Sequence, residues 1–278
     1  MPAITLIICL HRQRELLGRL VSESVGCYDD LLVVHDGPDV DDIRSAVEIA
    51  GGRFYTREGA CQQEQHWPFA WAQSKYDWIL RLDADEYPSD DLKTWLQKFR
   101  HSSEPPSDVS GYTCFWPLWN GKSQVSSKWP SGRFFLFNRQ RVRFFGMNEQ
   151  SPIPDNRCEA LDCVLHHEPK RKSFGLRNVL LRQQAWHWRS IIAESLLGNP
   201  TDLPCWRFIS EDWPIVWEEV RQKPLLTALK RMSLMFLREL RLQWRADRRF
   251  YIEAALNGPL HHALICLKFW QLRRRKTK

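Results

Sequence analysis

The chain has 278 residues, of which 43% are hydrophobic, and a formal net charge of +7. This length can bury a substantial core and lies between one large domain and two small ones. Three features are missing: a C-x-x-C pair among the eight cysteines, a leader-like N-terminus, and an apolar run of the roughly 18 residues that span a membrane. We therefore expect a cytoplasmic enzyme with one catalytic domain and an appendage, and no zinc or disulfide framework.

The first part of the chain alternates β-prone runs with helical segments. Ile4–Leu10 is a β-prone run that ends at His11, and Glu15–Val25 is compatible with a helix. A second run, Leu31–His35, ends at Asp36. This alternation predicts an α/β fold with a parallel, doubly wound sheet, whose ligands bind beyond the carboxyl ends of the strands. His11 and Asp36 fall at such ends.

A third β-prone run, at 77–82, leads into Asp83-Ala84-Asp85-Glu86. In a strand, Asp83 and Asp85 project from the same face, so their carboxylates could converge on one Mg²⁺ or Mn²⁺ that keeps open positions for diphosphate oxygens. The glycine-rich phosphate loop and the dinucleotide fingerprint are missing, so carboxylates, a metal and loop backbone would have to hold a nucleotide. The alternative is an ordinary polar turn.

These segments resemble an inverting family 2 glycosyltransferase with the GT-A fold, most similar to the bacterial lipopolysaccharide-core β-1,4-glucosyltransferase type. The nucleotide half of the resemblance consists of the opening strand, the turn at 36–42 and the run at 77–86. The acceptor half consists of 132–137, 142–149 and 164–166, so the resemblance spans roughly residues 3–170. The block at 83–86 is its most specific part. The fold it implies is a Rossmann-like, doubly wound mixed sheet.

The resemblance implies a UDP-sugar donor and Mn²⁺ or Mg²⁺ as cofactor. Asp36 would contact the uracil or ribose, and Leu10 and His11 would lie against the base. Asp83 would lie near the ribose and the metal, and Asp85 would be the main metal ligand and part of the catalytic machinery. Ala84 belongs to the same donor-binding block.

The segment at 61–68 departs from the family pattern. Family members carry an Arg-Asn or Lys-Asn pair there, close to the diphosphate, whereas this chain reads Cys-Gln-Gln-Glu-Gln-His-Trp-Pro. The remaining candidates for donor contacts in this region are Arg57, Gln62 and Gln65.

Inverting transfer needs a carboxylate that takes the proton of the acceptor hydroxyl. Glu149, just after a Phe-Phe-Gly turn, is the candidate base, and a solvated loop glutamate is the alternative. His166 ends a strand-like segment at 161–165, where related enzymes place a histidine that binds metal or diphosphate. His167 follows directly, and only one of two successive strand residues can face the site. We take His166 as the candidate and His167 as the second choice.

The predicted organisation has three parts: a nucleotide-sugar half at 1–100, an acceptor half at 101–220 and a basic tail at 221–278. The acceptor half is rich in Trp, whose rings stack well on sugars or pack in a core. The Q-x-x-R-W motif of processive family members is missing, so we expect the addition of a single sugar.

The tail holds the excess positive charge. Residues 221–278 contain 15 Lys and Arg against 3 Asp and Glu, a net of +12, which leaves 25 against 30, a net of −5, for residues 1–220. The stretch 225–249 fits an amphipathic helix, and a second helical pattern follows Asn257-Gly258-Pro259. One face of the first helix would carry Leu229, Phe236, Leu240 and Trp244, and another face Arg238, Arg241, Arg245 and Arg248. This pattern is typical of a helix in an anionic membrane interface. The alternative is a solvated helix packed on the catalytic domain; nucleic-acid binding is not expected.

The sequence thus predicts transfer of one sugar from a UDP-sugar to a glycolipid, lipopolysaccharide-core or surface-polysaccharide acceptor. The enzyme would be peripheral on the cytoplasmic face of the inner membrane. Two alternatives remain. One is a nucleotidyltransferase acting on a sugar phosphate, which needs a nucleoside triphosphate. The second is a non-catalytic membrane-binding scaffold, which the missing Arg-Asn pair favours.

Overall fold

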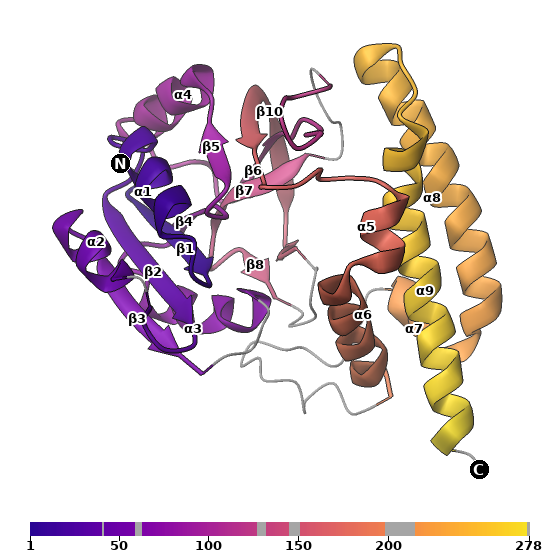
Figure 1. The fold of residues 1–278 in the computed structure, drawn as a ribbon. Coiled ribbons are helices and arrows are strands. Elements are labelled where there is room, and N and C mark those ends of the chain that lie inside the picture. Colours follow the sequence, from indigo (N-terminus) through magenta and orange to yellow (C-terminus); the bar gives the residue numbers. More distant parts are fainter. Residues whose placement is uncertain (41, 59–62, 127–131, 145–150, 198–214, 277–278) are drawn as a thin grey trace. The chain divides into compact units, whose positions relative to one another are not determined.

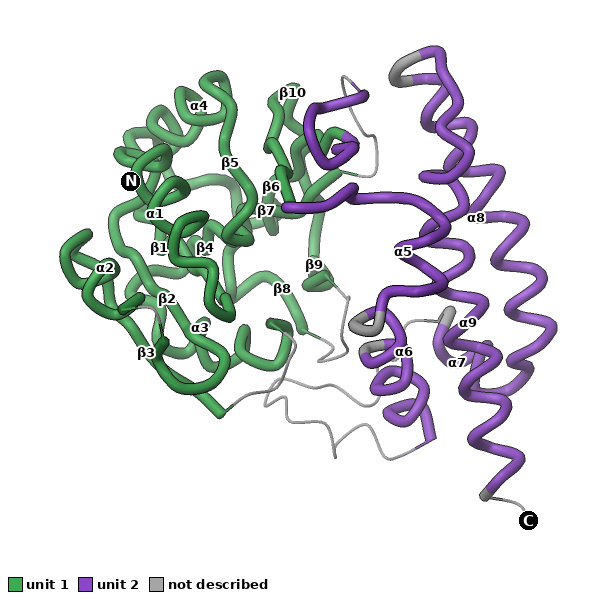
Figure 2. The backbone as a smooth tube through the Cα atoms, in the orientation of Figure 1, with its two compact units in different colours: residues 1–117, 131–144, 151–169 green, residues 118–130, 145–150, 170–278 purple. Residues whose placement is uncertain are grey.

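The computed structural model describes residues 1–40, 42–58, 63–126, 132–144, 151–197 and 215–276 (Figure 1). The chain divides into two compact units (Figure 2). Unit 1 comprises residues 1–117, 131–144 and 151–169, and unit 2 comprises residues 118–130, 145–150 and 170–278. The predicted three-part division at 100 and 220 stays a prediction.

Unit 1 is built on an eight-stranded sheet in the order β3-β2-β1-β4-β7-β6-β10-β5. The strands β3, β2, β1 and β4 are parallel, whereas β7 is antiparallel to both β4 and β6, so the sheet is mixed. The strands are β1 (Ile4–Leu10), β2 (Asp30–Asp36), β3 (Arg53–Arg57), β4 (Trp78–Arg81), β5 (Glu86–Pro88), β6 (Val109–Phe115), β7 (Arg133–Asn138) and β10 (Arg157–His167), with β8 (Val142–Arg143) and β9 (Ile153–Pro154) as a separate pair.

The helices of unit 1 pack on both faces of this sheet. Leu17 of α1, Val47 of α2 and Leu96 of α4 share one core with alternate residues of β1. On the opposite face, Trp71 of α3 packs against Phe137 of β7, with ring centroids 5.2 Å apart. Strand β1 is buried along its whole length, as expected of a central parallel strand covered on both sides. The helices are α1 (Arg14–Glu23), α2 (Ile43–Ile49), α3 (Trp67–Gln73) and α4 (Asp90–Arg100), with a 3₁₀ turn at Gln63–Gln65.

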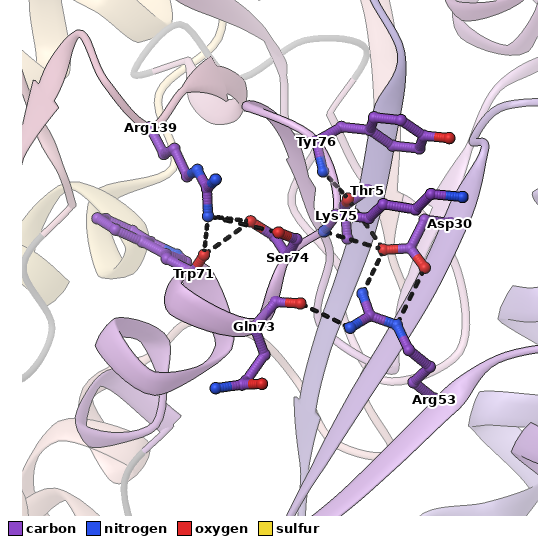
Figure 3. A network of polar contacts seen from close by, with 9 residues as sticks. All are labelled: Thr5, Asp30, Arg53, Trp71, Gln73, Ser74, Lys75, Tyr76 and Arg139. Atoms are coloured by element: carbon purple, nitrogen blue, oxygen red, sulfur yellow. Dashed lines mark hydrogen bonds and ion pairs between the residues drawn. The ribbon is translucent and has the colours of Figure 1, made fainter.

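A polar network fixes the connection between α3 and β4 (Figure 3). The guanidinium of Arg53 donates to Asp30 Oδ2 and to the carbonyl of Gln73, both at 2.6 Å. Arg139, which follows β7, donates to the carbonyl of Trp71 and to Ser74 Oγ. The end of α3 is thus tied to β3, through it to β2, and to the turn after β7.

Gly111 of β6 lies too close to β7 to carry a side chain. A Cβ there would lie 2.4 Å from the carbonyl oxygen of Leu136 and 2.6 Å from a ring carbon of Phe134. We expect Gly111→Ala to lower the free energy of unfolding by at least about 2 kcal/mol in a urea titration, because backbone would have to move. Gly18→Ala is the matched control: a Cβ on this exposed helical glycine meets nothing within 4 Å, so the helix should gain up to about 1 kcal/mol. Equal stability of the two variants would contradict the close approach.

Unit 2 is helical. Helix α8 packs along α9, and α6 packs on α9 as well. Leu118, Phe174 and Ala254 form a small core beside them, where the hydroxyl of Tyr251 donates to the carbonyl of Val125 at 2.8 Å. The helices are α5 (Leu176–Leu181), α6 (Gln183–Ser195), α7 (Ile215–Gln222), α8 (Pro224–Asp247) and α9 (Ile252–Lys276). Among the helices of the described chain, none is both long and apolar enough to cross a bilayer.

The two predicted tail helices are present, with two corrections. The second helix begins before Pro259: α9 starts at Ile252 and continues through the proline. Tyr251, the residue before α9, forms two hydrogen bonds with the side-chain amide of Gln243. On α8, Phe236 and Leu240 are half-buried rather than part of an exposed apolar face. The predicted α/β class, with a doubly wound mixed sheet and a C-terminal helical extension, is confirmed.

Candidate active site

The block Asp83-Ala84-Asp85 forms a turn between β4 and β5, not the end of a strand. Glu86 closes this turn from both sides: its backbone N–H donates to the carbonyl of Asp83 at 2.9 Å, and its Oε2 accepts from the backbone N–H of Asp83 at 2.8 Å. The expectation that Asp83 and Asp85 share one strand face is therefore wrong. Asp83 pairs with Arg133, and Asp85 lies near His167, which is also attracted by the charge of Asp83.

Asp83 is paired with Arg133, the first residue of β7. The Arg133 guanidinium lies 3.0 Å from Asp83 Oδ2, and it also lies 3.0 Å from Glu86 Oε1 and 3.1 Å from Glu86 Oε2. Burial alone would raise the pKa of Asp83, but Arg133 and then Arg81 lower it below its ordinary value. For Glu86, burial raises the pKa, and the attraction of Arg133 only partly offsets this effect.

Arg81 completes a buried cluster of two cations and two carboxylates below the turn. Its side chain is 2% exposed, and it donates to the carbonyl of Phe134 at 3.2 Å and lies 4.2 Å from the ring centroid of Trp67. Burial, and then the neighbouring Arg133, lower the pKa of Arg81 to about 9. Because buried charges are costly unless they are paired, the charge state of each group in this cluster depends on the others.

Asp85 lies near His167 of β10. Its Oδ2 lies 3.7 Å from His167 Nε2, and the His167 ring stacks on Trp116 with centroids 4.2 Å apart. Burial lowers the pKa of His167 to about 4, so the ring is neutral at pH 7 and the contact is not an ion pair. In β10, His167 is opposite Glu86 and His166 is opposite Tyr87. Successive strand residues point to opposite faces, so His167 replaces His166 in the proposal below.

The donor atoms of Asp85 and His167 suit a divalent cation. Adjacent ligands of an octahedral Mg²⁺ at about 2.1 Å lie about 3.0 Å apart, so Asp85 Oδ2 and His167 Nε2, which are 3.7 Å apart, would have to approach each other by about 0.7 Å to share one ion. Within the described residues, no group of three or more His, Cys, Asp or Glu is arranged to hold a metal. A cation here would have two protein ligands and would need diphosphate oxygens and water to complete its coordination.

A second polar group lies at the carboxyl end of β2. Asp36 is 8% exposed, its Oδ1 lies 2.9 Å from His66 Nε2, and its carbonyl accepts from His11 Nδ1 at 2.7 Å. Burial lowers the pKa of His66, although its hydrogen bond to Asp36 opposes this shift. Arg57 is opposite Asp36 in β3 and donates to the carbonyl of Gln65 at 3.1 Å.

Most predicted donor residues thus gather at the carboxyl ends of β1, β2 and β3. Leu10 is buried there, as is Ala84 in the turn after β4. Gln65 contributes its backbone rather than its side chain to the one contact described. Gln62 and the candidate base Glu149 lie outside the described residues.

Three residues of this region were not predicted from the sequence: Arg133, Trp116 and His66. Arg133 lies in the segment 132–137 on which the resemblance rests, but the pattern gives it no partner. Trp116 is one of many Trp residues that could contact a sugar or pack in the core. His66 lies in the segment 61–68, whose glutamines are the more obvious candidates. A charge count would have helped, because two buried carboxylates in one turn require a cation nearby.

Comparison with protein-family models and with curated proteins found no match. Among solved structures, residues 1–349 of S. aureus TarS in complex with UDP-GlcNAc match at 11% identity and a TM-score of 0.45, covering 98% of this chain and 92% of that one. In a further TarS structure, this chain spans only 44% of the matched chain.

The mannosyltransferase PcManGT from Pyrobaculum calidifontis, in complex with GDP-Man and Mn²⁺, matches at 12% identity and a TM-score of 0.45, covering 99% and 87% of the two chains. A CMP:2-keto-3-deoxy-manno-octonic acid synthetase complexed with CTP matches at 14% identity and a TM-score of 0.31, over 43% of this chain and 54% of that one. Likeness at this level carries no argument about the activity of this chain.

Proposed function

We propose that this chain is a metal-dependent glycosyltransferase that transfers one sugar, with inversion, from a UDP-sugar to a saccharide or lipid-linked acceptor. The observation that carries the proposal is the pairing of Asp85 with a neutral His167 at the carboxyl end of β4. Asp36 lies at the carboxyl end of β2, two strands away in the same sheet. In doubly wound sheets these ends form the ligand crevice.

Each group has a distinct task in this proposal. Asp85 and His167 would hold Mn²⁺ or Mg²⁺, which when bound offsets the negative charge of the departing diphosphate. Asp36 accepts a hydrogen bond from the uracil or ribose, and His66 orients its carboxylate. Glu149 takes the proton of the attacking acceptor hydroxyl. The finer identity proposed from the resemblance is a family 2 enzyme acting on a lipopolysaccharide core or surface polysaccharide.

A thermal-shift panel tests the donor class. UDP-glucose, UDP-GlcNAc, GDP-mannose and CTP are each added with and without Mn²⁺. We expect at least one UDP-sugar to raise the melting temperature, and the rise to need Mn²⁺. Stabilisation by CTP, but by no nucleotide sugar, would instead favour a nucleotidyltransferase, and stabilisation by none of them would favour a scaffold.

The role of His66 can be tested through UDP affinity. His66→Leu removes the 2.9 Å contact to Asp36, and hydrogen bonds to charged groups are worth about 1.5–3 kcal/mol. We expect the dissociation constant of UDP to rise roughly tenfold or more in calorimetry. His66→Gln is the control, because its amide nitrogen can replace Nε2 and should restore most of the affinity. Unchanged UDP affinity of His66→Leu would show that this pair does not shape the donor site.

We also propose that unit 2 attaches the enzyme to an anionic membrane surface. Helical spacing places two sets of exposed side chains next to each other along α8. The apolar stripe consists of Leu225, Leu226, Leu229, Leu237 and Trp244. The basic stripe beside it consists of Lys230, Arg238, Arg241 and Arg245. Leucine in the acyl boundary and cations at the lipid phosphates form the usual interfacial arrangement.

Co-sedimentation with phosphatidylglycerol vesicles tests this attachment. Changing Arg238, Arg241 and Arg245 together to Gln should weaken binding at low salt, because each cation near such a surface contributes about 1 kcal/mol. Leu237→Ser with Trp244→Ser should weaken binding even at high salt. The control changes Arg14, Arg44 and Arg157 of unit 1 to Gln, which removes the same charge from exposed sites elsewhere. Equal losses in the two triple variants would show that net charge, and not the basic stripe, sets the binding.

A further inference from the structure

The chain turns between β1 and α1 through two successive residues in the left-handed region of backbone conformation. Arg12 has a φ of 56° and Gln13 a φ of 72°. This region is unfavourable for any residue that carries a Cβ. Both side chains are exposed, so their own packing does not hold the turn. Its conformation has to be stabilised by bonds from the turn to the rest of unit 1.

One of these bonds runs to His35, the second-last residue of β2. The backbone N–H of Arg12 donates to His35 Nε2 at 3.1 Å, and the ring is 0% exposed, so no water competes for this bond. A ring nitrogen that accepts a hydrogen bond carries no proton, so the proton of the neutral ring lies on Nδ1. Nδ1 donates it to the carbonyl of Gly37 at 3.1 Å. Both ring nitrogens thus bond to backbone, and only one tautomer of His35 allows this.

A second bond joins the same two strand ends. His11 Nδ1 donates to the carbonyl of Asp36 at 2.7 Å, and the ring centroids of His11 and His35 lie 5.6 Å apart. The strand register brings these groups together, because Leu10, the last residue of β1, is directly opposite His35. The turn after β1 is therefore bonded to two successive residues of β2, one of which is the proposed donor contact Asp36.

We propose that His35 is a positioning residue for donor binding: its Nε2 holds the turn at 11–13 in the strained conformation that the nucleotide base requires. This inference rests on the proposed function, in which Asp36 contacts the uracil or ribose and the turn lies against the base. The bond to Gly37 keeps the proton on Nδ1, so that Nε2 can accept. Because His35 has no exposed surface for a ligand, its loss should weaken donor binding and leave the rate of the bound complex unchanged.

The two ring nitrogens can be tested separately. In His35→Gln the side-chain amide reaches the place of Nε2, where its oxygen can still accept from the Arg12 N–H. In His35→Asn the shorter amide reaches the place of Nδ1, where its nitrogen can still donate to the Gly37 carbonyl, but the Arg12 N–H loses its acceptor. Each variant keeps one bond, loses the other and removes the ring. If His35 only supports the fold, the two variants should bind UDP equally well.

The test measures the dissociation constant of UDP by calorimetry with Mn²⁺ present, and the KM and kcat for release of UDP from a UDP-sugar, on the full chain. We expect His35→Asn to raise the dissociation constant and the KM at least tenfold, and His35→Gln to raise them less than threefold. In both variants kcat at saturating donor should stay within twofold of wild type. An equal loss of affinity in the two variants, or unchanged affinity in His35→Asn, would overturn the inference.

A second substitution tests the strain itself. Glycine adopts a positive φ without a steric penalty, so Gln13→Gly should restore at least threefold of the UDP affinity that His35→Asn loses, while changing wild-type affinity less than twofold. Arg248→Gly is the matched control, because Arg248 is also left-handed, with a φ of 53°, but caps the end of α8 in unit 2. It should restore nothing. Equal restoration by the two glycines, or none by Gln13→Gly, would contradict a strained turn held by His35.

A measurement on the wild-type chain needs neither a variant nor a nucleotide. In nuclear magnetic resonance, the ring nitrogen shifts of His35 should show the tautomer with its proton on Nδ1, and a proton on Nε2 would overturn the inference. If wild type shows the expected tautomer but binds neither UDP nor any UDP-sugar, the proposed function is what fails. UDP binding that His35→Asn leaves unaffected would instead refute the role of His35 alone.

Discussion

Asp85→Asn is expected to lower kcat/KM for sugar transfer by roughly 10²- to 10³-fold at saturating Mn²⁺, because the carboxylate supplies charge as well as geometry to the cation. The fold should survive, since the backbone carbonyl of Asp85 still accepts from the N–H of Glu168 at 2.9 Å. Steady-state assays over a range of Mn²⁺ concentrations, together with an unfolding titration, measure both effects.

Asp77→Asn is the control for that substitution. Asp77 lies just before β4, and its carboxylate pairs with Arg139 at 2.8 Å. This exchange removes the same charge from the same short segment, so it should leave transfer within about twofold of wild type if only the turn after β4 binds the cation. If Asp85→Asn kept wild-type turnover, the assignment of Asp85 as a metal ligand would be wrong.

Glu149→Gln is expected to lower kcat by roughly 10²- to 10⁴-fold, the usual effect of losing a general base, with little change in UDP affinity. Glu149 lies outside the described residues, so this prediction rests on its place in the sequence after the Phe-Phe-Gly turn. Single-turnover transfer and UDP calorimetry measure the two quantities separately. Loss of UDP binding would assign Glu149 to the donor site or the fold, and unchanged kcat would mean that a different group takes the proton.

Strands β1 and β2 were predictable because they are buried on both faces. Ile4–Leu10 and the core of β2 are continuous β-prone runs, and the structure confirms both within one residue. Helix α1 was also expected close to its observed bounds, because its apolar spacing is regular. The local sequence pattern is enough to predict an element where its buried residues recur with the period of a helix or a strand.

The turn at 83–86 was not predictable in the same way. The alternation of Asp83 and Asp85 fits a strand, but Glu86 makes two short-range hydrogen bonds that close the segment into a turn. The cation that stabilises it, Arg133, comes from a strand fifty residues further along the chain. A local sequence pattern cannot show this pairing, because β7 lies beside β4 only in the folded sheet.

The choice between His166 and His167 depended on register. Both follow the same strand-like run, and a shift by one residue exchanges the two faces. The pairing of β10 with β5 sets that register, and the sequence does not show which short strand β10 meets at its end.

Pro259 is a different case: a proline usually ends a helix pattern, but α9 begins seven residues earlier because packing against α8 and α6 outweighs the local cost.

Metal-dependent release of UDP from a UDP-sugar is the most direct test of the central claim, because it requires the donor site and the cation but no identified acceptor. The full chain is incubated with the UDP-sugar that stabilises it best, with Mn²⁺ or with a chelator, and free UDP is measured over time. We predict slow release that needs Mn²⁺, is lost in Asp85→Asn and is retained in Asp77→Asn. Release that is unaffected by the chelator, or no release from any UDP-sugar under conditions where the protein is folded, would contradict the claim.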